Sequence, residues 1–379
     1  MPQPFTIAIP EETLTDLHQR LRRTRWPDQV DAYGWAQGSE LGYTQELARY
    51  WAQEYDWRHH EAEINRFDHF TATIDGQPLH VIHQRSPHAD AKPLLIQHGW
   101  PGSFYEFHQI IPMLTHPEQH GGRPEDAFHV VAPSLPGYTF SPAPQAPGMT
   151  TRAMGALMHG LMRDLGYTRF GTQGGDWGAM VTSWLAFDHP DSIIGVHLNM
   201  QGLRARVGES PLNDAERAYV AHARGLYREV TPHFVIQGAH PQSIGYGLMD
   251  SPAGLLGWLA QKFRAWTDCD GELRNAVSWD TFLTNVTLYW VTGCITSSAR
   301  LYYEHSHAAD DVLPSNGRIE SPTGFAHFPG ELFHPPRSWV ERAYNVVRWT
   351  EMPKGGHFAA MEQPARLAAD VRAFFAERE

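Results

Sequence analysis

Residues 170–179 read Phe-Gly-Thr-Gln-Gly-Gly-Asp-Trp-Gly-Ala, a short apolar run followed by a glycine-rich turn and the start of a helical pattern. In a nucleophile elbow the chain turns sharply between a strand and a helix, so small residues must lie two before and two or three after the nucleophile. Gly174, Gly178 and Ala179 meet this demand. The turn therefore predicts that Asp176 is a nucleophile. The alternative is an ordinary glycine-rich turn in which Asp176 caps the helix.

Strands alternate with helices on both sides of this turn. Asp75-Gly76 lies between two alternating runs, which is typical of a β-hairpin. Apolar, strand-like runs cover residues 93–97, 129–132, 170–172, 193–198, 324–328 and 345–350, and helical patterns cover residues 151–165, 177–187 and 363–376. Such alternation predicts an α/β fold with a mostly parallel sheet whose strands are buried on both faces.

Two segments depart from this alternation. Residues 201–312 are rich in helical patterns, at residues 212–227, 252–267 and 279–300. A helical insertion late in an α/β fold is most simply a lid over the active site, so we expect a lid at 201–312 inserted in a core of residues 67–200 and 313–379. Amphipathic helical patterns before residue 67, the second at 44–55, predict an N-terminal arm over residues 1–66.

Composition and charge limit the partners. The 379 residues carry 30 Lys and Arg against 42 Asp and Glu, a formal net charge of −12, which disfavours nucleic acid and anionic membranes. Two cysteines, Cys269 and Cys294, are too few for a disulfide framework, and we expect reduced, buried thiols. The N-terminus lacks a signal-peptide pattern, and no apolar run is long enough to span a membrane. We therefore expect a cytoplasmic protein with no membrane anchor and a neutral ligand.

A second motif, His98-Gly99-Trp100-Pro101, follows the strand-like run at residues 93–97. In α/β-hydrolases the loop after this strand supplies one backbone N–H of the oxyanion hole, and the residue after the nucleophile supplies the other. The motif therefore predicts an oxyanion hole made by the N–H groups of Trp100 and Trp177.

A third motif, Gly355-Gly356-His357, lies between the last strand-like run and the last helical pattern, where this fold carries its catalytic base. The chain holds 23 histidines, and the glycine pair and the position single out His357. The remaining member of the triad should be a carboxylate between the lid and this histidine. The candidates are Asp310, Asp311, Glu320 and Glu331. We favour Glu331, because it follows an apolar strand-like run and gives the chain order nucleophile, acid, base.

An aspartate nucleophile limits the chemistry. A carboxylate that attacks an ester or an amide would give an anhydride, which is a poor intermediate. Attack on an sp³ carbon that bears a strained or good leaving group gives a stable alkyl ester instead. His357, oriented by Glu331, can then activate water to hydrolyse that ester at the carbonyl carbon of Asp176. The substrate class narrows to epoxides and alkyl halides.

Six motifs resemble those of the microsomal-type epoxide hydrolases. They are DLHQRLRRTRW (16–26), HGWPGSFYEF (98–107), QGGDWG (173–178), LTNVTLYWVTG (283–293), FPGELFHPP (328–336) and GGHFAAMEQP (355–364). The resemblance runs from about residue 5 to the C-terminus. It implies an α/β-hydrolase core and an N-terminal meander that wraps the lid. It also implies that Asp176 is the nucleophile, His357 the base and Glu331 the acid.

In that family two lid tyrosines donate a proton to the epoxide oxygen. Tyr302 matches one of them, whereas His233 stands where the family has the other tyrosine. An imidazole can donate a hydrogen bond only if it is protonated or in the right tautomer. Three options stay open: His233 as the second donor, Tyr246 in its place, or Tyr302 alone. The residues expected to contact a small apolar or aromatic epoxide are Trp100, Trp177, Tyr246 and Phe358.

Two other functions are compatible with parts of the pattern. A haloalkane dehalogenase would use the same triad, and the indole of Trp177 could hold a halide, but it needs neither phenol donors nor the N-terminal arm. A ligand-binding protein on the same fold usually lacks the nucleophile or the base. We expect no cofactor and no metal, because no G-x-G-x-x-G, P-loop or H-E-x-x-H pattern is present. The oligomeric state stays open, with a homodimer as one option.

Overall fold

One nine-stranded sheet organises the molecule, which the computed structural model describes over residues 2–206, 210–308 and 313–378. The strand order is β1-β2-β3-β5-β4-β6-β7-β8-β9. The strands are β1 (Gln3–Pro4), β2 (His69–Ile74), β3 (Gln77–Gln84), β4 (Lys92–Gln97), β5 (Phe128–Pro133), β6 (Phe170–Gly174), β7 (Ile193–Leu198), β8 (Ile319–His327) and β9 (Tyr344–Glu351). The pairs β1-β2, β2-β3 and β3-β5 are antiparallel, and every other neighbouring pair is parallel.

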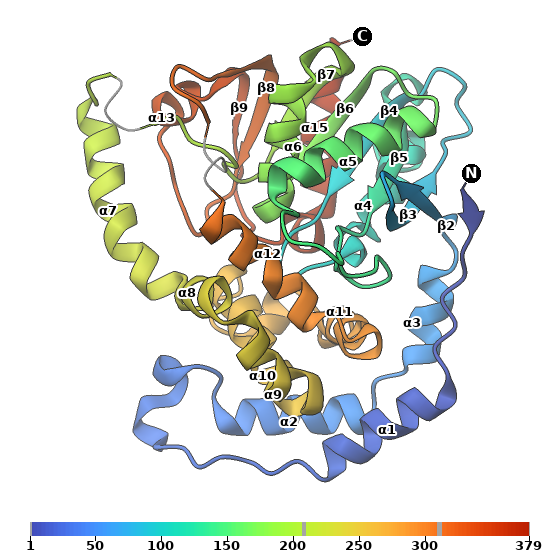
Figure 1. Ribbon diagram of the computed structural model, residues 1–379, viewed down its shortest axis with the longest axis vertical. Coiled ribbons are helices and arrows are strands. Elements are labelled where there is room, and N and C mark those ends of the chain that lie inside the picture. Colours follow the sequence, from blue (N-terminus) through green and yellow to red (C-terminus); the bar gives the residue numbers. More distant parts are fainter. Residues whose placement is uncertain (1, 207–209, 309–312, 379) are drawn as a thin grey trace.

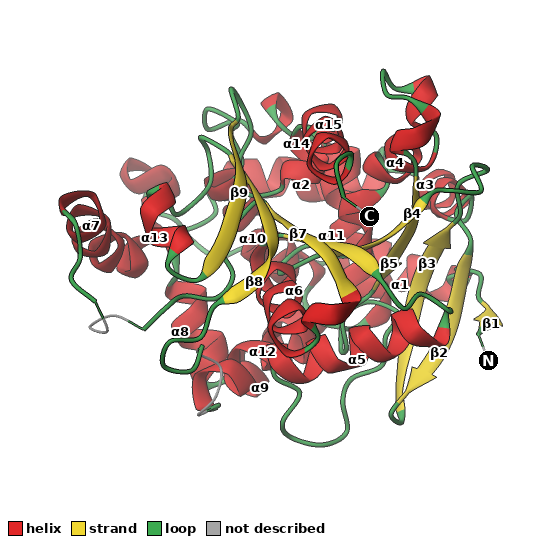
Figure 2. Ribbon diagram, turned by 90° about the horizontal axis from the view of Figure 1, so that it is seen from above, coloured by secondary structure: helices red, strands yellow, loops and turns green. Residues whose placement is uncertain are grey.

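Helices cover both faces of this sheet. Figure 2 shows α5 and α6 on one face and α4, α14 and α15 on the other. The helices that follow core strands are α4 (Ile110–Thr115), α5 (Thr151–Asp164), α6 (Asp176–Asp188), α13 (Arg337–Glu341), α14 (Ala359–Glu362) and α15 (Pro364–Phe375). Every residue of β5 and β7 is buried, as expected for strands with helices on both sides. The predicted α/β fold with a mostly parallel sheet is confirmed.

Among the described residues, six α-helices follow one another between β7 and β8; α8 to α12 lie beyond one end of the sheet, whereas α7 runs alongside it (Figure 1). We call them the cap helices: α7 (Asp214–Val230), α8 (Pro232–Ala239), α9 (Pro241–Asp250), α10 (Pro252–Trp266), α11 (Trp279–Thr292) and α12 (Ile295–His307). The helical pattern at residues 279–300 is split into α11 and α12. The helix α11 ends at Gly293, whose φ of 63° is the left-handed conformation that ends many helices and favours glycine.

The N-terminal helices lie against the cap helices on the side away from the sheet (Figure 1). They are α1 (Glu11–Arg22), α2 (Leu41–Gln53) and α3 (Trp57–Ile64). α2 begins earlier than the pattern at 44–55 suggested, because the carboxylate of Glu40 accepts hydrogen bonds from the first backbone N–H groups of the helix. The indole of Trp51 donates a hydrogen bond to Thr287 at 2.9 Å, and the hydroxyl of Tyr55 donates one to Thr284 at 3.0 Å. The arm is therefore tied to one face of α11.

Two expectations from composition can be compared with the coordinates. Cys269 and Cys294 are both buried free thiols, as predicted. Over the described residues, no helix combines the length and the apolar character needed to cross a membrane.

Candidate active site

The turn between β6 and α6 has the geometry of a nucleophile elbow. Asp176 has a backbone φ of 48°, a value that residues other than glycine rarely adopt. Its neighbours allow this turn because they have no side chain. A Cβ on Gly174 would lie 2.4 Å from the carbonyl oxygen of Gly178, and a Cβ on Gly178 would lie 2.1 Å from that of Gln97. Gly175 is the N-cap of α6, so Asp176 does not cap the helix and its carboxylate points toward a cavity.

Backbone N–H groups converge on this carboxylate. The N–H of Trp100 donates a hydrogen bond to Oδ1 of Asp176 at 2.7 Å, and the N–H of Trp177 also donates to the carboxylate. Gly99 makes the approach of the two segments possible, because a Cβ there would lie 2.2 Å from Oδ1. The two N–H groups named by the sequence thus point at a single carboxyl group, as the donors of an oxyanion hole must.

The loop that carries Trp100 is held from the cap. Asn285 donates a hydrogen bond to the carbonyl of Pro101 at 2.7 Å, and the hydroxyl of Tyr289 donates one to the carbonyl of Gly102 at 2.7 Å. Both side chains come from one face of α11, four residues apart. The motif at residues 283–293 contains both side chains, but the sequence alone assigned them no role. Their spacing of four residues was the one indication that they share a helical face.

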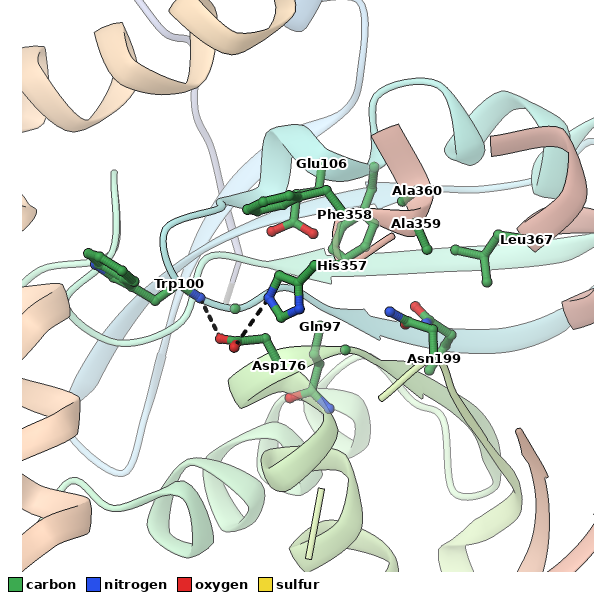
Figure 3. Close-up of a pocket in the computed structure, with 14 residues that line it drawn as sticks. Gln97, Trp100, Glu106, Asp176, Asn199, His357, Phe358, Ala359, Ala360 and Leu367 are labelled. Atoms are coloured by element: carbon green, nitrogen blue, oxygen red, sulfur yellow. Dashed lines mark hydrogen bonds and ion pairs between the residues drawn. The ribbon is translucent and has the colours of Figure 1, made fainter. Parts of the chain in front are cut away.

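His357 lies between the carboxylates of Glu331 and Asp176, and Figure 3 shows its approach to Asp176. Its Nδ1 is 2.9 Å and 3.1 Å from the carboxylate oxygens of Glu331, and its Nε2 is 3.4 Å from Oδ2 of Asp176. Glu331 and His357 have side chains that are only 2% and 3% exposed, whereas the carboxylate of Asp176 is 22% exposed, because it faces the cavity. The three side chains named as a triad therefore form one continuous line.

The charges of neighbouring groups set the pKa values of His357 and Asp176. Burial would lower the pKa of His357, but the charges and hydrogen bonds of Glu331 and Asp176 outweigh it, and the pKa lies well above its usual value. Burial would raise the pKa of Asp176, but the hydrogen bond and charge of His357 outweigh it and hold the pKa below its usual value. The free site therefore contains an ionised Asp176 carboxylate beside an imidazolium.

A buried carboxyl group that the sequence did not single out holds the loop of His357. Glu362 accepts hydrogen bonds from the backbone N–H groups of Asp268, Gly356 and Phe358 at 2.8, 2.9 and 3.0 Å. The backbone N–H of His357 itself donates to the carbonyl of Trp266 at 2.9 Å. Because Trp266 is the last residue of α10 and Asp268 follows it closely, the loop of His357 is fastened to the end of a cap helix.

Aromatic rings surround the cap side of Asp176. The ring of Tyr302 stands edge-on to those of Trp177 and Trp100, with centroids 4.7 Å and 5.6 Å away. His233 stacks on Trp100 with centroids 5.2 Å apart and planes 10° apart. Burial lowers the pKa of His233 to about 3, so its imidazole is neutral at physiological pH and can donate through one N–H only. The indole N–H groups of Trp100 and Trp177 are buried and have no hydrogen-bond partner.

Other residues named from the sequence lie elsewhere. Tyr246 does not reach this site, because its side chain is 72% exposed on α9 and borders a different surface cavity. Phe358 lies at the site, buried against the ring of Phe263 at 4.0 Å between centroids. Among the alternative acids, Glu320 is exposed beside Arg318. Asp310 and Asp311 lie outside the described residues.

Comparisons with known proteins agree with this geometry. A family model described as "Epoxide hydrolase N terminus" matches residues 2–107, and one described as "alpha/beta hydrolase fold" matches residues 92–223. Epoxide hydrolase 1 of Sus scrofa is 37% identical over 98% of this chain and 88% of its own length. The crystal structure of juvenile hormone epoxide hydrolase from the silkworm Bombyx mori matches with a TM-score of 0.90 and 29% identity, covering 100% of this chain and 94% of the other. The structure of Aspergillus niger epoxide hydrolase matches with a TM-score of 0.85 and 32% identity, covering 100% and 96%.

Proposed function

The chain belongs to the epoxide hydrolase family of α/β-hydrolases, and from that membership we propose that it opens an epoxide to a vicinal diol through an ester on Asp176. One observation carries the proposal: a carboxylate stands at the nucleophile position of the elbow, with two backbone N–H groups and the imidazole of His357 directed at it. A serine there would favour acyl transfer, whereas a carboxylate suits attack on a saturated carbon.

The first step forms the ester. A carboxylate oxygen of Asp176 attacks one epoxide carbon, and the bond from that carbon to the ring oxygen breaks. The alkoxide that forms takes a proton from the hydroxyl of Tyr302, and the phenolate regains a proton from water. A hydrogen bond from the neutral imidazole of His233 to the same oxygen would share this role. The contacts of Tyr302 and His233 with the ring of Trp100 support this arrangement, because the N–H of Trp100 contacts the nucleophile.

The second step hydrolyses the ester. Esterification removes the negative charge of Asp176, and with it one of the interactions that raise the pKa of His357. The imidazole can then lose its proton and take one from a water molecule that attacks the carbonyl carbon of Asp176. The N–H groups of Trp100 and Trp177 stabilise the oxyanion, and its collapse releases the diol, which receives the proton from His357. One water oxygen remains in the carboxylate of Asp176.

The cap side suggests the class of substrate. The rings of Trp100, Trp177, Tyr302 and His233 offer an apolar, aromatic surface at the point of attack. We infer a small epoxide with an apolar or aromatic substituent, and we infer that the cap helices act as the lid predicted for residues 201–312.

A single turnover in ¹⁸O-labelled water tests the proposal. The peptide that contains Asp176 is isolated after the reaction and weighed. Label in the carboxylate is the expected result, and label only in the diol would replace the ester route by direct attack of water. The same preparation separates the alternatives. Halide release from 1,2-dibromoethane without diol from styrene oxide would indicate a dehalogenase, and no turnover of a broad epoxide panel would indicate a binding protein.

A further inference from the structure

A small cavity borders Asp176 and His357 on the side of the sheet, which we call the core side, because its lining includes Gln97 and Gln173 but neither Tyr302 nor His233. It offers about 20 Å³ to a water molecule, and its walls include the side chains of Asp176, His357 and Glu106 beside the apolar rings of Phe107 and Phe358. One water fits such a space, and it needs polar partners there. An epoxide with an aromatic substituent is far too large for it. The cavity is therefore suited to the second reactant, water.

The position of Glu106 is fixed by the loop that also builds the oxyanion hole. The residue lies in the 3-10 turn Phe104–Phe107, and its carboxyl group packs on the backbone of Gly102, where a Cβ would lie 1.6 Å from Oε1. The N–H of Gly99 donates a hydrogen bond to the same carboxyl group. Gly99 also contacts Oδ1 of Asp176, so the nucleophile and Glu106 lie on two sides of one short loop.

Figure 3 shows the carboxyl group of Glu106 directed toward the ring of His357. Burial raises the pKa of Glu106 to about 8, so at neutral pH the group is a carboxylic acid with one O–H donor and one carbonyl acceptor. A neutral acid can hold a water molecule without adding another negative charge beside the carboxylates of Asp176 and Glu331.

We propose that Glu106 is a positioning residue that holds the hydrolytic water in this cavity, an inference that rests on the ester route proposed above. The water donates one O–H to Nε2 of His357 and the other to the carbonyl oxygen of Glu106, which leaves a lone pair facing the carbonyl carbon of Asp176. During attack the first of these protons passes to His357 and the new C–O bond forms on Asp176, while Glu106 is unchanged. Water and substrate then occupy opposite sides of the nucleophile.

Two substitutions of similar size test the proposal. Glu106→Leu removes both hydrogen-bonding groups, and Glu106→Gln keeps a neutral carbonyl acceptor in the same place. Rapid-quench kinetics with styrene oxide separates formation of the ester, followed as modified protein by mass, from its hydrolysis. We expect Glu106→Leu to slow hydrolysis by about 10- to 100-fold, the effect of losing the orientation of one reactant, and to leave ester formation within about threefold. Glu106→Gln should restore most of the hydrolysis rate.

Several results would overturn the role of Glu106. Equal losses in both steps would make it a purely structural residue, and an unchanged hydrolysis rate in Glu106→Leu would remove it from the reaction. If Glu106→Leu fails to fold, a high-resolution crystal structure of the unchanged protein decides: a water within hydrogen-bond distance of both Glu106 and His357 is expected, and a dry cavity contradicts the proposal. Absence of any ester in the unchanged protein is a different outcome, because it refutes the proposed function itself.

Discussion

The two sides of Asp176 differ in chemistry. On the cap side Tyr302 and His233 contact the ring of Trp100, and the imidazole of His233 is neutral. The core side has a cavity of about 20 Å³ whose walls include the ionisable groups of His357 and Glu106. Under the proposed ester route, the two half-reactions therefore take place in contrasting surroundings. A poorly soluble epoxide is accommodated by apolar surface, whereas the activation of water depends on groups whose pKa values are shifted by their neighbours.

Asp176, the proposed nucleophile, borders both sides, so its removal should have the largest effect. Asp176→Ala should lower kcat/KM for epoxide opening by about 10⁴-fold or more, because no ester can form. The measurement is diol formation together with the mass of the protein after mixing with excess epoxide. Residual activity above that level, with no mass increase, would mean that water attacks the epoxide directly and that the two sides do not divide the reaction.

The next effect should be confined to the core side. In His357→Gln, ester formation should persist while its hydrolysis slows by about 10³-fold, within the range for loss of a general base. The expected signature is a burst of epoxide consumption equal to the amount of protein, followed by almost no turnover. Glu331→Gln should slow hydrolysis of the ester less than His357→Gln does, because the imidazole remains but loses its orientation. A variant of His357 that fails to alkylate would show that this residue also serves the first step.

The cap side should respond in the opposite way. Tyr302→Phe should slow ester formation by about 100-fold, the lower end for loss of a general acid, and should leave hydrolysis of a preformed ester unchanged. His233→Phe should have a smaller effect on the same step. Pre-steady-state burst kinetics provides both rates. Slower hydrolysis in Tyr302→Phe would contradict the separation of the two sides.

The smallest expected effect concerns the loop of His357. Burial raises the pKa of Glu362 to about 7 from an ordinary value of 4.5, so the folded protein holds this proton more tightly than the unfolded chain does. The stabilisation linked to that proton is complete below about pH 4.5 and is lost as the pH rises through 7. Glu362→Gln removes this dependence and leaves buried N–H groups unpaired, at a cost of about 1–3 kcal/mol each.

Thermal unfolding at several pH values measures this effect. The Tm of Glu362→Gln should lie below that of the unchanged protein, and the gap should narrow between pH 4.5 and 7 because only the unchanged protein loses stability there. A gap that widens with pH would mean that Glu362 is ionised in the fold. Activity should change by only a few-fold, since the side chain acts through the backbone of the loop.

The sequence predicted the sharp turn at Asp176 because the steric demands of such a turn are local. Gly174 and Gly178 are required by contacts within a few residues and with one neighbouring strand, so the pattern alone indicates the geometry. The order of catalytic residues along an α/β-hydrolase chain then indicates His357. Its Nε2 lies 3.4 Å from Oδ2 of Asp176, which agrees with that expectation. The prediction of these roles still awaits experiment.

Residues that act through tertiary contacts could not be predicted in the same way. Glu106 and Glu362 were passed over because each is an ordinary glutamate until packing buries it among backbone N–H groups. Tyr246 is an alternative to His233 from the sequence, but the face it occupies on α9 is set by the packing of whole helices, and that face is exposed. Periodicity tells which residues share a face, not which neighbour that face will meet.

The anchoring of the Trp100 loop by α11 has a consequence for chimaeric proteins. Asn285 and Tyr289 bind the carbonyls of Pro101 and Gly102, while Thr287 of the same helix accepts a hydrogen bond from Trp51. The cap helices therefore cannot be exchanged as one block, because some of them are bonded to loops of the core and to the N-terminal segment. An exchange of cap sequence with a homologue must therefore keep α11 together with the Trp100 loop and the N-terminal segment, and the end of α10 together with the loop of His357.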